Sequence, residues 1–391
     1  MKGHSTPALL RSAGIVVISL LGTTGTAWAI PTYARQYNLS CSACHSPVPK
    51  LTQFGESFAA NGFQLEGIEM PNTILQTGDS SLSLMRELPL AVRFDGFARI
   101  LPDHEQKTDF EWPFVMKIFS SGEIKKDISY FFYFLMNEGG TITGVEDAFL
   151  YFNDIAGQKL DITVGQFQVA DMIFKRELRP TFEDYQIYEV RPGMTKADLT
   201  YDRGIILNYT LPSETDLYFL ALNGNGIGPS TDGLYDSDPF KNFCGRVAQP
   251  LGSSITIGTV GYLGKESLQG SINRLSMVGG DASFAFDRFE LLGQYIHRHD
   301  ANPFFLGAKD STINSYGGFA QLMYAPAAEK SDWYVFLLYN NVRSDIEEVK
   351  YHSLAGNFTY MVSRNFKLTG EYGYDIERAK HSMTFGFMTA F

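Results

Sequence analysis

Hydrophobic and polar residues alternate along most of the chain from Leu90 onward. Between Leu90 and Ile100 every even position is apolar except Gly96, and Arg93, Asp95 and Arg99 stand at odd positions. The final run, from Ser382 to Phe391, likewise places its large aromatic side chains at odd positions. Because successive side chains of a strand point to opposite faces, this period of two predicts strands with one apolar and one polar face.

The alternation supports about sixteen strands, and the links between them differ in length. Links after even-numbered strands are short, such as Asp287-Arg288 and Ser363-Arg364, whereas links after odd-numbered strands are often long, such as Asn225–Lys241. This asymmetry predicts an all-β fold, an antiparallel outer-membrane β-barrel. The first strand would start, and the last strand would end, on the periplasmic side. A soluble β-sandwich has no reason for such asymmetry. The predicted strands start near Leu90, Phe114, Ser129, Asp147, Leu160, Gly204, Leu217, Asn242, Ser254, Leu275, Phe289, Tyr316, Trp333, Ser353, Asn365 and Ser382.

Composition narrows the class of protein further. The 391 residues are 14% aromatic and only 19% charged, and the mean hydropathy of −0.11 is compatible with strands that alternate between apolar and polar faces. The sequence has no run of eighteen apolar residues, which excludes a helical membrane protein. The net charge of −11 argues against a nucleic-acid partner.

The N-terminus predicts export. Lys2 and Arg11 precede a short apolar stretch from Ala13 to Leu21, and Ala27-Trp28-Ala29 supplies a small-x-small ending. This pattern is typical of a cleavable signal peptide over residues 1–29. We therefore expect a compact segment over 30–88 and a barrel over 89–391 in an exported protein.

Two of the three cysteines lie in Cys41-Ser42-Ala43-Cys44-His45, which has the C-x-x-C-H spacing of a c-type haem attachment site. Two thiols at this spacing add to the two vinyl groups of haem c, and the adjacent imidazole becomes the proximal iron ligand. A thioredoxin-like redox pair would need a βαβ context, and a zinc site would need a second pair of ligands downstream. Neither is present in the sequence, so Cys41 and Cys44 are predicted to bind haem, with His45 on its iron. Residues 30–88 are accordingly predicted to form a small, partly helical monohaem cytochrome c segment. Cys244 is predicted to be structural.

The residues after the motif predict a short helix beside the haem. Pro49 is suited to the first helical turn, Leu51, Phe54 and Phe58 would form an apolar stripe, and Gly62 would end the helix. A carbonyl of Pro47 or Pro49 is expected to accept the Nδ1–H of His45.

The sixth iron ligand is predicted to be Met70, with Met85 as the next candidate, because no histidine lies between His45 and His104. The alternative is that Met70 only fills a gap in the packing.

Three other features have weaker functional interpretations. The long link from Val169 to Arg203 either folds inward and narrows the pore or forms a solvated surface loop. His297 and His299 could bind a metal, but their parity with Phe289 places them on the lipid face. Asp103-His104-Glu105 could meet a cation in the first outer loop. No triad, phosphate loop or paired carboxylates indicate a conventional active site.

One stretch of the sequence resembles a known family. Pro31 to Gln36, Cys41 to His45, Phe54-Gly55 and the run from Phe58 to Phe63 resemble the N-terminal signature of fused outer-membrane cytochrome–porins, best known from iron-oxidising bacteria. The resemblance is dense over residues 31–63 and only architectural over the barrel. It implies one covalent haem near or within the lumen, which takes electrons from extracellular Fe(II) and passes them to a periplasmic cytochrome. The activity implied is that of an Fe(II):cytochrome c oxidoreductase.

Two alternatives remain open at this point. The chain could conduct electrons outward to an oxidised metal, or it could be a solute channel whose haem segment acts as a plug. Outer-membrane lipid is an expected partner in every case.

Overall fold

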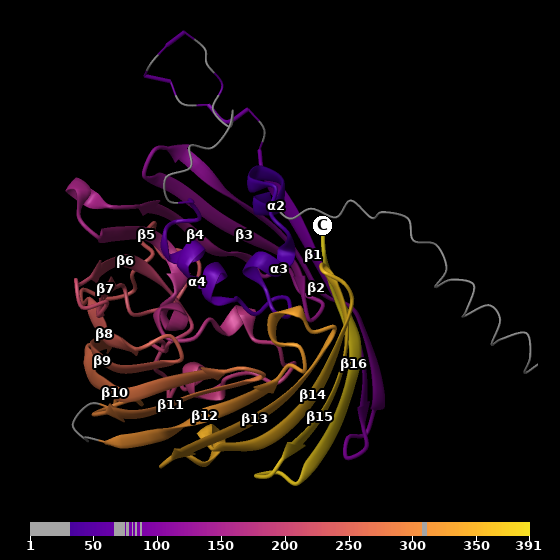
Figure 1. Cartoon of the computed structure of the whole chain (residues 1–391). Helices are drawn as coiled ribbons and strands as arrows, with labels where there is room; N and C mark the ends of the chain where they lie inside the picture. The colour runs from indigo at the N-terminus through magenta and orange to yellow at the C-terminus, as the bar shows by residue number, and fades with distance from the viewer. Residues whose placement is uncertain are drawn as a thin grey trace, which may run out of the picture.

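The computed structural model describes residues 32–65, 75, 78, 79, 81, 82, 84–86, 88–306 and 311–391. Sixteen antiparallel strands pair with their sequence neighbours, and β1 pairs with β16 to close a barrel (Figure 1). The predicted fold class is confirmed. The predicted signal peptide, residues 1–29, lies outside the described residues.

The strands have the following bounds: β1 Leu90–Leu101, β2 Lys107–Lys125, β3 Ile128–Glu138, β4 Gly144–Phe152, β5 Leu160–Gln168, β6 Tyr201–Thr210, β7 Asp216–Leu222, β8 Asn242–Leu251, β9 Ile255–Leu268, β10 Ser271–Phe286, β11 Phe289–Asp300, β12 Ile313–Tyr324, β13 Trp333–Ser344, β14 Tyr351–Ser363, β15 Phe366–Asp375 and β16 Lys380–Ala390. Three helices precede them: α2 Thr32–Tyr37, α3 Cys41–Cys44 and α4 Gln53–Ala60. Six 3₁₀ turns lie between strands: η1 Ile155–Gly157, η2 Val169–Met172, η3 Arg176–Leu178, η4 Gln186–Glu189, η5 Ala328–Lys330 and η6 Glu347–Val349. None of the helices in the described part of the chain has the length and hydropathy needed to cross a bilayer.

The start of β2 is the main difference from the predicted strand boundaries. This strand begins at Lys107 and not near Phe114. Proline cannot donate to a sheet ladder, so Pro113 argues against a strand there. The barrel accommodates Pro113 at a point where the β1–β2 register shifts, between Asp95 and Phe97.

Parts of the barrel wall are apolar on both faces. On β13, Leu337 and Tyr339 are 47% and 42% exposed on the outside, whereas Phe336 and Leu338 are fully buried on the inside. An apolar inner face cannot line a water-filled channel at low free-energy cost, so another part of the chain must cover it.

The segment from Val169 to Thr200, between β5 and β6, supplies that cover. Its side chains Ile187, Tyr188 and Leu199 are buried in one apolar cluster with inward residues of the wall, such as Leu338. The inward-folding hypothesis for this link is therefore confirmed, and the solvated-loop alternative is wrong. We call residues 169–200 the lumen loop.

The three N-terminal helices lie at the end of the barrel that carries the short turns and the C-terminus (Figure 1). Ser129, at the start of β3, donates from Oγ to the carbonyl of Gly62 at 2.7 Å. The Ser46 and Tyr334 hydroxyls are 3.0 Å apart, and Nδ2 of Asn153 donates to the carbonyl of Asn61 at 2.9 Å. These contacts attach the segment to opposite parts of the short-turn mouth.

Candidate functional site

Helix α3 brings the two predicted haem cysteines together. Cys41 and Cys44 are three residues apart in a helix, so they lie on neighbouring positions of one face. Ser40 caps the helix by accepting the Ser42 N–H, and the His45 N–H donates to the carbonyl of Cys41 at 2.9 Å. His45 leaves the helix with extended backbone, directly after the second cysteine.

The His45 ring is held in one tautomer. Its Nδ1 lies 2.8 Å from the carbonyl oxygen of Pro49, as predicted for one of the two prolines. Because a carbonyl can only accept, Nδ1 carries the proton, and the neutral ring presents an unprotonated Nε2. Burial lowers the pKa of His45, which favours this neutral form. An imidazole in this state is the form that binds a metal.

Helix α4 begins later than the sequence suggests. It starts at Gln53, because the Thr52 hydroxyl accepts the Gly55 N–H and serves as the N-cap. Pro49 instead lies in the preceding turn, where its carbonyl is free to hold His45. As a result only Phe58 of the predicted apolar stripe is fully buried, and Phe54 is 43% exposed.

The end of α4 agrees with the prediction. Gly62 has a φ of +56° and follows the C-cap residue Asn61. The Phe63 N–H donates to the carbonyl of Phe58 at 2.9 Å, which is the bond of a Schellman motif.

Gly55 sets the spacing between α3 and α4. A Cβ at this position would lie 2.2 Å from the carbonyl oxygen of Cys44. The Thr52 hydroxyl also donates to the carbonyl of Ala43 at 2.7 Å, across the same contact. The cysteine-bearing turn is thus packed directly on the backbone of α4.

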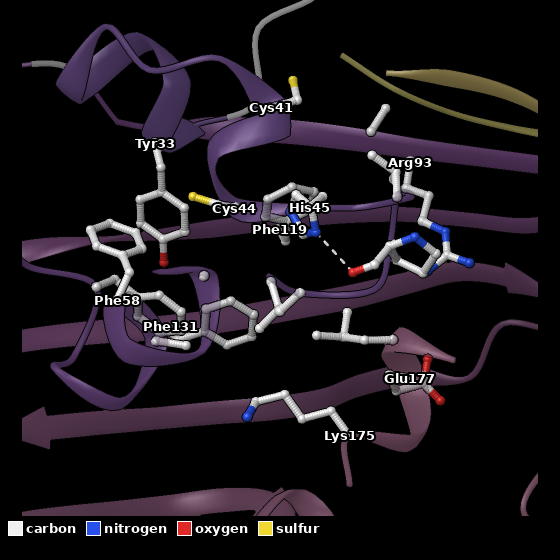
Figure 2. Close-up of a pocket in the computed structure, with 18 of the residues that line it drawn as sticks. Tyr33, Cys41, Cys44, His45, Phe58, Arg93, Phe119, Phe131, Lys175 and Glu177 are labelled. Carbon is white, nitrogen blue, oxygen red and sulfur yellow. Dashed lines mark hydrogen bonds between the residues drawn. The ribbon is translucent and has the colours of Figure 1, made fainter. Parts of the chain in front are cut away.

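A cavity that opens to solvent lies between these helices, the barrel wall and the lumen loop. Cys41, Cys44 and His45 line it from the N-terminal side. The wall adds Phe119 from β2 and Phe131 from β3 to this lining. Figure 2 shows His45 between Cys44 on one side and Arg93 on the other. Further apolar lining includes Tyr33, Leu51, Phe58, Phe63 and Phe149.

The residues present fit a covalently attached haem. A porphyrin is a large apolar ring that needs an apolar cavity, two thiols at its edge and a free imidazole nitrogen near its centre. The cavity combines aromatic walls, both thiols of α3 and the unprotonated Nε2 of His45. Burial raises the pKa of both Cys41 and Cys44, so the free thiols are protonated at neutral pH.

Neither predicted sixth ligand lines this cavity in the part of the chain that the structure describes. Met70 lies outside the described residues and stays a prediction. Met85 lies against β2, with Sδ 3.6 Å from the position that a Cβ on Gly122 would take. Met85 is not among the described residues that line the cavity.

The weaker metal candidates are not assembled into sites. His297 faces outward and stacks on Tyr316, and Nδ1 of His299 lies 3.1 Å from Oδ1 of Asn314. Asp103 accepts the backbone N–H of His381 at 2.7 Å. Within the described ranges, no group of three or more His, Cys, Asp or Glu side chains could hold a metal ion.

Cys244 is buried inside the barrel, only 2% exposed, in the apolar cluster with Leu220 and Tyr262. This position agrees with the predicted structural role.

Sequence reasoning missed the charged side chains that share the cavity. Arg93 comes from β1, Lys117 from β2 and Asp147 from β4, while Lys175 and Glu177 come from the lumen loop. Alternation alone assigns Arg93 to the inner face. The sequence carries no signal that residues so far apart would meet there.

Buried polar side chains of the barrel wall anchor the lumen loop. Arg298 on β11 donates to the carbonyls of Val190 and Ala197 at 2.8 and 2.6 Å, and Asp300 pairs with Arg298 at 2.7 Å. Four strands farther along the wall, on β15, the carboxylate of Glu371 accepts the N–H groups of Phe182 and Glu183, each at 2.7 Å. The loop is therefore bound to the inner wall at both β11 and β15.

Comparison with solved structures relates this barrel to known ones. The anion-selective porin of Comamonas acidovorans matches with a TM-score of 0.59 and 10% identity, over 78% of this chain and 99% of the porin. OmpF of Salmonella typhi, solved with daunomycin, matches with a TM-score of 0.57 and 11% identity, over 78% of this chain and 97% of that one. The outer membrane channel DcaP of Acinetobacter baumannii gives a TM-score of 0.54 and 13% identity over the same shares. No protein-family model and no curated protein sequence matches the chain. At these identities the comparisons show the fold alone: the chain forms a sixteen-stranded barrel of the porin type.

Proposed function

We propose that this protein is an outer-membrane electron-transfer protein that carries one covalent haem in the short-turn mouth of its barrel. In this proposal it accepts electrons from extracellular Fe(II) and passes them to a periplasmic cytochrome. The observation that carries the haem is the cavity that Cys41, Cys44 and His45 line together, with Nδ1 of His45 held by the carbonyl of Pro49 and Nε2 unprotonated. The choice of Fe(II) rests on the resemblance over residues 31–63.

The residues of the cavity have distinct roles in this proposal. A bound haem supplies one-electron transfer at its iron. Cys41 and Cys44 attach it, and His45 binds the iron through Nε2. Pro49 keeps the imidazole in the correct tautomer through the 2.8 Å hydrogen bond to Nδ1. Phe119 and Phe131 exclude water from the ring.

The barrel supports an outer-membrane location. Apolar side chains such as Leu337 and Phe358 are about half exposed on its outer face, where lipid would cover them. Short turns of such barrels face the periplasm, so the haem segment would lie on the periplasmic side. This placement favours direct contact between the haem segment and a periplasmic electron acceptor.

The test uses the detergent-solubilised, fully oxidised full-length protein under anaerobic conditions. After mixing with Fe(II) in a stopped-flow instrument, we expect rapid and saturable growth of the reduced haem α-band. Dithionite serves as the control for a reducible haem. Reduction by dithionite but not by Fe(II) would overturn the substrate and leave outward conduction as the alternative. Reduction by neither would contradict the haem assignment.

A matched pair of variants tests the attachment site. Cys41→Ser together with Cys44→Ser should abolish covalently bound haem, measured on the denatured protein. Cys244→Ser removes the buried thiol inside the barrel and should leave the covalent haem content unchanged. Equal haem content in the two proteins would show that the C-x-x-C-H motif does not bind the cofactor.

A solute channel is the second candidate, and the porin-type fold favours it. The apolar contacts of the lumen loop oppose it, because they place part of the chain inside the lumen against the wall. Single-channel recording in planar bilayers separates the two candidates. Sustained conductance of the full-length, haem-loaded protein would favour the channel.

A further inference from the structure

Two cations face each other on the wall of the haem cavity. Arg93 on β1 and Lys117 on β2 are direct cross-strand partners, and both line the cavity. Lys117 is only 7% exposed. Like charges placed directly opposite on antiparallel strands normally destabilise a sheet. A pair of this kind, in a water-poor site, indicates that negative charge is to be bound nearby.

The nearest carboxylates do not saturate the hydrogen-bond donors of these two cations. Asp95 accepts from Nε and Nη2 of Arg93 at 3.0 and 2.7 Å, which leaves the donors of Nη1 unused by this carboxylate. Glu177 lies 3.5 Å from Nζ of Lys117, longer than a charge-assisted hydrogen bond. Lys117 also lies over the ring of Tyr133, 4.3 Å from its centroid. Both cations therefore keep donors for a further acceptor.

The position of the pair identifies the class of ligand. In Figure 2, Cys44 lies on one side of His45 and Arg93 lies on the other. A haem bound to the two cysteines through its vinyl edge has its two propionate carboxylates at the opposite edge. We propose that Arg93 and Lys117 form a carboxylate-binding pair that receives these two propionates. The inference rests on the proposed function, because it requires a covalent haem on Cys41 and Cys44.

The chemistry of the two side chains suits this role. A guanidinium binds a carboxylate through parallel N–H donors, and an ammonium adds a compact charge. A propionate buried without a cation would have to take up a proton or lose its hydration at a large cost. With Arg93 and Lys117 in place, both propionates stay ionised inside the barrel.

The experiment uses the full-length, haem-loaded protein and the variants Arg93→Gln and Lys117→Met. Arg99→Gln is the matched control, because Arg99 lies on the same strand, pairs with Glu111 at 3.2 Å and is outside the described cavity lining. Covalent haem content should equal that of the unaltered protein in all three variants. The propionate bands of the resonance Raman spectrum should shift in Arg93→Gln and Lys117→Met only. Loss of a nearby positive charge should also lower the haem midpoint potential, by about 59 mV for a tenfold change in the one-electron equilibrium.

The outcomes separate this inference from the proposed function. Absence of covalent haem in the unaltered protein would overturn both. Suppose that Arg93→Gln and Lys117→Met have normal haem content, and that their Raman bands and midpoint potentials equal those of Arg99→Gln. This result would overturn the carboxylate-binding pair but not the proposed function. If Arg93→Gln does not assemble, Lys117→Met and Arg93→Lys take its place. Shifted propionate bands in Lys117→Met, with nearly unaltered bands in Arg93→Lys, would support the carboxylate-binding pair. Unshifted bands in Lys117→Met would overturn it.

Discussion

Single residues set the geometry of the cysteine-bearing turn. Gly55 is required where α4 meets α3, because any larger residue would place its Cβ against the carbonyl of Cys44. Thr52 and Pro49 complete the arrangement by capping α4 and orienting His45. The geometry of the C-x-x-C-H turn therefore depends on three residues outside the motif.

We expect Gly55→Ala to destabilise the packing of α3 on α4 by about 1–3 kcal/mol, the usual cost of overpacking. Covalent haem content per barrel should fall, because the cysteines and His45 would no longer be held in place. The control is Gly228→Ala, where an added Cβ meets nothing within 4 Å. Equal haem content in both variants would contradict the close contact.

A buried carboxyl in the lumen loop makes stability depend on pH. Burial raises the pKa of Asp171 from 3.8 to about 7, with Lys175 opposing the shift and Glu56 and Glu177 adding to it. Between these two pH values the unfolded chain has lost the proton while the folded chain still holds it. Folding then takes up a proton, so stability falls as the pH rises through this window.

Asp171→Asn should therefore stabilise the protein more at pH 8 than at pH 4. The readout is the urea midpoint of the detergent-solubilised protein at the two pH values. Asp232→Asn, at an exposed loop position, should show no such difference. A gain from Asp171→Asn that is the same at both pH values would argue against the raised pKa.

At the scale of elements, the lumen loop is held by the wall and not by regular structure of its own. The loop contains only three short 3₁₀ turns, but buried groups of several strands bind its backbone. Arg298 and Asp300 are 2% and 0% exposed, so this ion pair lies wholly inside the protein. Removing one partner of such a pair costs about 3–5 kcal/mol, since it leaves an uncompensated buried charge.

The double variant Arg298→Met, Asp300→Leu avoids a lone buried charge and removes the bonds from Arg298 to the loop. We expect the loop to detach from β11 and the single-channel conductance to rise above that of the unaltered protein. His297→Leu alters the adjacent, outward-facing position on the same strand and should leave the conductance unchanged. If the conductance of the double variant does not rise, other anchors, such as Glu371, are sufficient to hold the loop in place.

For the whole molecule, the apolar outer face requires a membrane. A charge in the middle of that face should be costly, whereas the same charge at the rim should be tolerated. Leu337→Arg, in the middle of β13, is expected to lower the unfolding free energy in lipid vesicles by about 2–4 kcal/mol. Leu251→Arg, at the short-turn end of β8, should cost about 0–1 kcal/mol. Equal costs for the two variants would contradict a transmembrane orientation of the barrel.

The barrel was predictable from sequence because its signal is local. Alternation along each strand and the lengths of the links are properties of neighbouring residues, so the starts of fifteen strands were predicted to within four residues. The C-x-x-C-H motif was also readable, since its chemistry depends on spacing within five residues. The exception is β2, which begins at Lys107, because a register shift against β1 lets this long strand continue past Pro113.

The sequence by itself thus determined the strand order, the two faces of each strand and the cysteines and histidine of the candidate site. Only the tertiary structure decided that residues 169–200 pack inside the lumen, that Pro49 rather than Pro47 orients His45, and that Arg93, Lys117 and Glu177 share one cavity. The physical reason is the range of the interactions. Periodicity and motif spacing act over a few residues, whereas burial of the lumen loop and the balance of charge in the cavity arise only when the barrel closes and brings distant strands together.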